Sequence, residues 1–129
     1  MRIKLPPAEP VFTFRHAYHK LGRPVFTTIR GKGHFKKLKV GQRVLLECPS
    51  ASSGGIWRGQ AAALVTGLEL RRVRELPLEL LKADAEWPGN TIGEHQHFIN
   101  LLNSFRAPAW DRVTMDSELT VITLKIIQP

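Results

Sequence analysis

The chain of 129 residues contains one cysteine, Cys48, so it can form neither an internal disulfide nor a zinc site built from several cysteines. Its longest apolar stretches, 61–65 and 119–127, are much shorter than the roughly 20 residues that cross a bilayer. The basic start of the chain is not followed by the apolar segment of a secretory signal. These features predict a cytoplasmic protein in a reducing compartment, with no membrane partner.

The histidines give no recognisable metal motif. His95 and His97 are two residues apart in a segment predicted to be helical, and residues at that spacing do not share a helix face. The chain has no His-Glu-x-x-His sequence, and Gly31-x-Gly33 lacks the rest of any dinucleotide or phosphate-loop fingerprint. The sequence therefore predicts neither a metal nor a cofactor.

Positive charge is abundant and unevenly distributed. The net charge is +8, and residues 1–74 hold fifteen Lys and Arg against three acids, a net of +12. Residues 75–129 hold four Lys and Arg against eight acids, a net of −4. Such an excess on one part of the molecule attracts polyanions, which favours a nucleic acid or nucleotide as the ligand.

Hydrophobic patterning predicts one α+β domain at 11–129, preceded by a proline-rich extended leader at 1–10. The pattern indicates helical turns at 16–21, a mobile basic loop at 31–39, a turn at 40–42 and a hairpin loop at 49–55. A helix is expected at 78–86, and a second helix should start at Thr91, because Glu94 completes a capping box. The expected strands are 11–14, 25–30, 43–48, a long bent or bulged element at 56–73, and 119–127. This order predicts a small, partly open β-barrel with flanking helices.

Two segments resemble the ASCH family of the PUA-like superfamily. They are Gly-Arg-Pro-Val-Phe-Thr-Thr-Ile-Arg at 22–30, where that family has a Gly-x-Lys-x-x-[Thr/Glu]-x-Arg signature, and the turn Lys-Val-Gly-Gln-Arg-Val at 39–44. The resemblance, which extends over roughly 11–127, implies a β-barrel with a cleft that binds RNA or nucleotides beside the signature strand. Some small bacterial members that resemble this chain are amidohydrolases of N4-acylated cytidine, with Lys, Thr and Glu in the cleft. Thr28 and Glu86 match the last two, whereas Val25 holds the position of the lysine and can neither activate a nucleophile nor polarise a carbonyl.

Two functions follow as alternatives. The first is a module that binds RNA, single-stranded nucleic acid or a nucleotide, and the absence of the signature lysine favours it. Arg30 suits bidentate recognition of a phosphate or a base, although it could equally be a surface arginine paired with an acid. The other residues expected to bind the ligand are Arg23, Thr27, Lys32, Lys36, Lys37 and the stacking side chain Trp87. The second function is a small hydrolase acting on a modified nucleoside or on RNA, with Glu86 as general base and Thr28 positioning the substrate.

Overall fold

The computed structural model describes residues 10–14, 20, 23–52, 58–85, 90–104 and 112–128. The expected leader at 1–9, most of the expected helical turns at 16–21, and both Glu86 and Trp87 lie outside these residues. Within the described part, the elements in chain order are β1 (Val11–Thr13), β2 (Val25–Gly31), α1 (Gly33–Lys37), β3 (Arg43–Ser52), β4 (Arg58–Arg72), the 3-10 helix η2 (Val73–Glu75), α2 (Leu78–Ala85), α3 (His95–Ser104) and β5 (Glu118–Gln128).

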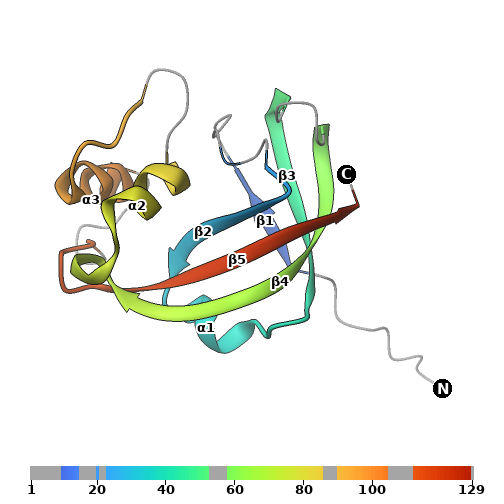
Figure 1. Cartoon of the computed structure of the whole chain (residues 1–129), viewed down its shortest axis with the longest axis horizontal. Coiled ribbons are helices and arrows are strands. Elements are labelled where there is room, and N and C mark those ends of the chain that lie inside the picture. The colour runs from blue at the N-terminus through green and yellow to red at the C-terminus, as the bar shows by residue number, and fades with distance from the viewer. Residues whose placement is uncertain are drawn as a thin grey trace.

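The strands form one five-stranded sheet in the order β1-β3-β4-β5-β2. Only the pairing of β1 with β3 is parallel; the other three pairings are antiparallel. The sheet curls into a half-barrel, with α2 and α3 together at one end and α1 beneath the strands (Figure 1). This architecture confirms the predicted α+β fold with a partly open barrel and flanking helices.

Two hydrophobic clusters hold the fold together. The first joins aromatic and aliphatic side chains of all five strands, including Phe12, Phe26 and Leu124. The second lies where α2 and α3 cover the sheet, and includes Phe98 together with Leu119 of β5. Strand β5, which lies between β4 and β2 in the sheet, contributes side chains to both clusters.

The predicted strands at 11–14, 25–30, 43–48 and 119–127 are confirmed. The long element at 56–73 is the single strand β4, and its pairing with β5 shifts register between Val65 and Gly67, as expected for a bulge. A Cβ on Gly67 would lie 2.9 Å from Oγ1 of Thr123, so a side chain there would require Thr123 to shift. The turn at 40–42 is also confirmed, and Gly41 adopts a φ of 92° that favours glycine.

Three local predictions were wrong. Residues 33–37 of the expected basic loop form the short helix α1, which Leu38 follows as a buried anchor. Strand β3 continues to Ser52, into the expected hairpin loop, because its pairing with β4 extends to Arg58. Helix α3 begins at His95 rather than at the Thr91 capping box, since Gly93 donates its N–H to Nδ1 of His97 instead. Of the helices within the described ranges, none has the length and apolar character needed to cross a bilayer.

Candidate functional site

A pocket of about 240 Å³ opens where the two edge strands of the half-barrel approach each other, beside α2 and α3. Strand β2 and the segment after β1 form one side of it, and the helices form the other. Its walls combine charged, hydroxyl and apolar side chains from segments far apart in sequence. The lining residues are Thr13, Phe14, Lys20, Thr28, Ile29, Arg30, Gly31, Asp84, Ala85, Phe98, Leu101, Leu102 and Leu119.

A buried ion pair lies in this pocket. Nζ of Lys20 donates to Oδ1 of Asp84 at 2.7 Å, and the Lys20 residue is only 5% exposed. The same carboxylate oxygen accepts the backbone N–H of Ile29 at 3.0 Å, which ties α2 to β2. Burial lowers the pKa of Lys20 below its ordinary value, against the opposing effect of Asp84. The pocket therefore contains an amine that gives up its proton more readily than a lysine in water.

Arg30 joins the two edges of the sheet. Its guanidinium carbon lies 5.0 Å and 5.1 Å from the ring centroids of Phe12 and Phe14, close enough for cation–π attraction. Nε of Arg30 donates to Oγ1 of Thr28 at 3.1 Å, and Nη2 reaches the carbonyl of Thr13 at 3.5 Å. Because Thr28 accepts this bond, its own hydroxyl proton is available for donation. Thr28 is 2% exposed, so a ligand must enter the pocket to meet it.

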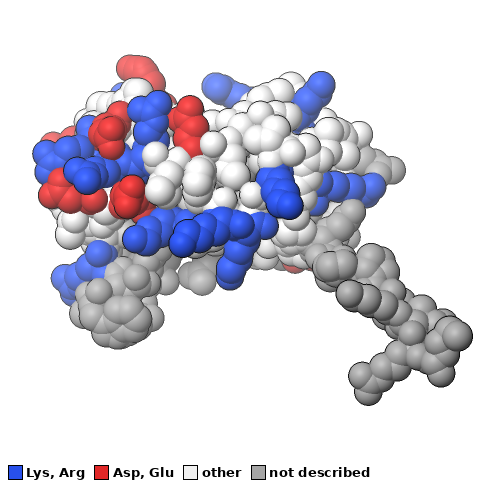
Figure 2. All heavy atoms as spheres, turned by 90° about the horizontal axis from the view of Figure 1, so that it is seen from below, with Lys and Arg blue, Asp and Glu red and all other residues white. Residues whose placement is uncertain are grey.

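A second, more open hollow of about 620 Å³ adjoins the first. The two share Gly31 and Leu119, which are a cross-strand pair of β2 and β5. Lys32, Lys37 and Arg112 supply positive charge, opposed by two acids. Figure 2 shows Lys and Arg side chains in a row across the face that carries α1, with acidic side chains gathered at the end that carries α2 and α3. The unequal charge of the two halves of the sequence thus becomes a difference between regions of the surface.

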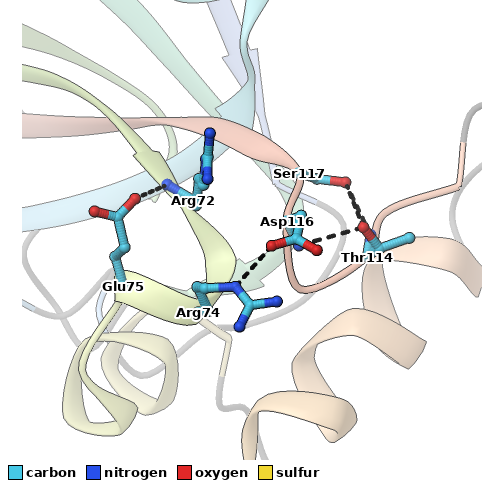
Figure 3. A network of polar contacts seen from close by, with 6 residues as sticks. All are labelled: Arg72, Arg74, Glu75, Thr114, Asp116 and Ser117. Carbon is cyan, nitrogen blue, oxygen red and sulfur yellow. Dashed lines mark hydrogen bonds and ion pairs between the residues drawn. The ribbon is translucent and has the colours of Figure 1, made fainter.

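One of the acids in this hollow is already paired. Asp116 accepts a hydrogen bond from Nε of Arg74 at 2.7 Å (Figure 3). The surrounding turn is held to the end of β4, because Arg74 donates its backbone N–H to the carbonyl of Met115 at 2.9 Å. Arg71 is likewise bonded to Glu69 at 3.2 Å. The basic cluster at 71–74 is therefore partly neutralised by neighbouring acids.

No family model matches the chain. Over 94 residues, which are 71% of this chain and 75% of the relative, the sequence is 44% identical to the uncharacterized protein MJ0364 of Methanocaldococcus jannaschii. The chain belongs to the same family as this archaeal protein. Its fold is similar to the crystal structure of protein EF3133 from Enterococcus faecalis, a member of the family DUF984, with a TM-score of 0.62 over 99% of this chain and 80% of that one. At 15% identity this second likeness shows the half-barrel fold alone.

The structure brings together some of the residues expected to bind a ligand and separates others. Thr28 and Arg30 line the pocket, and Lys32 and Lys37 line the adjoining hollow. The side chains of the remaining described candidates do not line either space. Arg23 and Lys36 are exposed, and Thr27 is half-buried on the strand face opposite Thr28.

Sequence reasoning missed two of the three charged residues that line the pocket, Lys20 and Asp84. They are 64 residues apart, and neither position carries a local signal: the lysine lies two residues before a glycine, and the aspartate lies near a helix end. The position expected for the signature lysine is occupied by Val25, whose side chain is 47% exposed. The amine that does line the pocket is that of Lys20.

His34 lines the second hollow. Its Nδ1 lies 3.3 Å from the carbonyl of Gly31, and its ring centroid lies 6.0 Å from that of Phe12. Burial lowers the pKa of His34 against the opposing effect of the hydrogen bond to Gly31, and the nearby charges of Arg30 and Lys37 lower it further. The ring is therefore mainly neutral at pH 7. Among the residues that the structure describes, no group of three His, Cys, Asp or Glu side chains is arranged to hold a metal.

Proposed function

We propose that this protein is an ASCH-type module of the PUA-like superfamily that binds RNA or single-stranded nucleic acid by taking one nucleotide unit into the pocket. The observation that supports it most is the convergence on one pocket of Thr28, which the family resemblance implies, and Arg30, which the chemistry of its side chain suggests. Fold likeness and the basic face are consistent with it. The fold alone hosts many functions, so the pocket carries the argument.

The dimensions and chemistry of the pocket suit a nucleobase or nucleoside. Its volume of about 240 Å³ is below the roughly 300–1,000 Å³ of pockets for drug-sized ligands. Phe98, Leu101 and Leu102 of α3 offer an apolar wall for a flat ring. In the same pocket, Thr28 can donate a hydrogen bond, and Asp84 can accept one from an exocyclic amine. A nucleobase has this combination of apolar faces and polar edges.

Binding of a short single-stranded RNA should weaken steeply as salt is added, because cations on the basic face release counterions from the phosphates. Contact with three to five phosphates gives a slope of log affinity against log salt of roughly −2 to −4 for a single strand. Fluorescence anisotropy titrations from low to moderate salt measure this slope. A flat slope, or no binding at low salt, would remove the nucleic-acid proposal.

A second candidate, hydrolysis of a modified nucleoside, is favoured by the position of Lys20. The amine of Lys20 lines the same pocket as Thr28, with Asp84 beside it, so the Lys-Thr-carboxylate set implied by the resemblance has a counterpart with Asp84 in place of Glu86. In hydrolysis of an N4-acyl amide, water adds to the acyl carbon and the C–N bond breaks. The Lys20–Asp84 pair could take the proton from water and return it to the leaving amine, giving cytidine and a carboxylic acid.

Incubation with N4-acetylcytidine, followed by chromatography of released cytidine, tests this candidate. If the pair transfers protons, Lys20→Met should lower the rate by roughly a hundredfold or more. Lys125→Met, at an exposed position of β5 outside both spaces, is the matched control and should retain the rate. Circular dichroism of both variants shows whether a lost rate reflects lost folding. Absence of cytidine release by the wild-type protein would exclude this hydrolase and leave the binding proposal standing.

A further inference from the structure

The pocket and the adjoining hollow differ in chemistry but share a wall. The pocket has aromatic and aliphatic sides, whereas the hollow is lined mainly by charged and polar residues. Their common boundary is the cross-strand pair Gly31 and Leu119, so only one pair of residues separates the two spaces. A ligand with an apolar ring at one end and an anionic group at the other would fit this arrangement.

We propose that the second hollow is the phosphate subsite of the ligand whose base enters the pocket, so that the protein selects a phosphorylated nucleoside over the free nucleoside. This inference rests on the proposed function and specifies its ligand. Lys32 and Lys37 line the hollow from α1 and the residue before it, and Arg112 lines it from the segment that precedes β5. An arginine and two lysines on different segments can surround a phosphate group from more than one direction.

The boundary between the two spaces is fixed by hydrogen bonds. The carbonyl oxygen of Gly31 accepts the hydroxyl proton of Thr120 at 2.9 Å, and Nδ1 of His34 approaches it at 3.3 Å. Thr120 is fully buried, so the first of these bonds is shielded from water. The Thr120 bond engages a lone pair of the carbonyl, which reduces the repulsion of an anion in the hollow by this oxygen.

The acids of the hollow do not cancel its attraction for phosphate. Asp116 is bonded to Arg74 at 2.7 Å, so its charge is compensated from outside the hollow. Glu118 is the second acid. Besides the paired Asp116, the lining of the hollow therefore has three cations and one carboxylate. This excess of positive charge favours a phosphate that carries one or two negative charges.

Calorimetric titrations with each of the four ribonucleosides and with their 5′- and 3′-monophosphates test the subsite. Of the 5′- and 3′-monophosphates, the one that binds more tightly should have an affinity for the wild-type protein about tenfold or more above that of its nucleoside. The reason is that hydrogen bonds to a charged group are stronger than those between neutral groups. Lys37→Ala should remove most of this difference while leaving nucleoside affinity within about twofold. Lys39→Ala removes the same charge two residues later, at an exposed position that lines neither space, and should leave both affinities unchanged.

The possible results separate this inference from the proposed function. The phosphate subsite would be overturned if the nucleoside and its monophosphates bound with equal affinity, or if Lys37→Ala and Lys39→Ala lost equal monophosphate affinity. In either case, binding of the nucleoside would still support the pocket as the site of the base. Tight binding of inorganic phosphate that does not compete with the nucleotide would also overturn it, since the anion would then occupy another place. If no nucleoside, nucleotide or oligonucleotide bound, both proposals would fail. Both lysines are exposed, so the variants are expected to fold like the wild type.

Discussion

Replacing Asp84 by alanine should lower the free energy of unfolding by about 3–5 kcal/mol, the range for breaking a buried ion pair by removing one partner. The variant leaves the Lys20 amine buried without its carboxylate and the N–H of Ile29 without its acceptor. Urea denaturation followed by circular dichroism measures the change. A loss below about 1 kcal/mol would mean that water reaches the pair through the pocket and that the interaction contributes little.

The double variant Lys20→Met, Asp84→Ala isolates the contribution of charge. Because it removes the uncompensated amine, it should recover at least half of the stability lost in Asp84→Ala. The remaining loss comes from the Ile29 N–H, which has lost its acceptor, and from the cavity that the Asp84 side chain leaves. If the double variant were as unstable as the single one, the packing of Asp84, and not its charge, would be the source of the effect.

Stability of Asp84→Ala should also depend on pH in the alkaline range. Burial lowers the pKa of Lys20 in the folded protein, and without Asp84 nothing of comparable size raises it again. Between that lowered pKa and the ordinary value of 10.5, the unfolded chain binds the proton that the folded chain has released. The free energy of unfolding must therefore rise with pH across this window, and more in the variant than in the wild type.

The sheet was largely predictable from the sequence because its strands carry local signals. Residues 25–29 are all β-branched or aromatic, and Gly41 marks the turn before β3. Helix α1 was missed because it starts at Gly33 just after Gly31, and because three of its five residues have charged or titratable side chains. These features are typical of a loop. What makes it a helix is the docking of Leu38 in the core, a tertiary contact that no short window contains.

The candidate site was predictable only where one strand carries it. Thr28 and Arg30 occupy alternate positions of β2, so the strand pattern places both on the same face. Lys20 and Asp84 meet only because α2 packs against β2, where Ile29 binds the same carboxylate. This meeting of two segments 64 residues apart is a tertiary contact, so no motif within one segment could predict the ion pair in the pocket.

Phe98→Ala should destabilise the protein by about 3–5 kcal/mol, the range for truncating a buried phenylalanine. Its side chain is fully buried between α3 and the sheet, and it also forms part of the pocket wall. Leu102, one turn later on the same wall, is half-buried and should cost less on truncation. The sequence pattern alone predicts both residues on the buried face of the helix and does not rank them. A difference in their loss of stability therefore reports how α3 is oriented against the sheet.

His97→Ala is the control on the other side of α3. The imidazole is exposed, and its Nδ1 accepts the N–H of Gly93 at 3.0 Å, a bond that water can replace. Its removal should therefore cost about 1 kcal/mol or less. Urea melts of the three variants under one condition give the ranking Phe98→Ala, then Leu102→Ala, then His97→Ala. A loss at His97 as large as that at Phe98 would show that the helix is rotated in solution, with a different face toward the pocket, and that Phe98 cannot form its apolar wall.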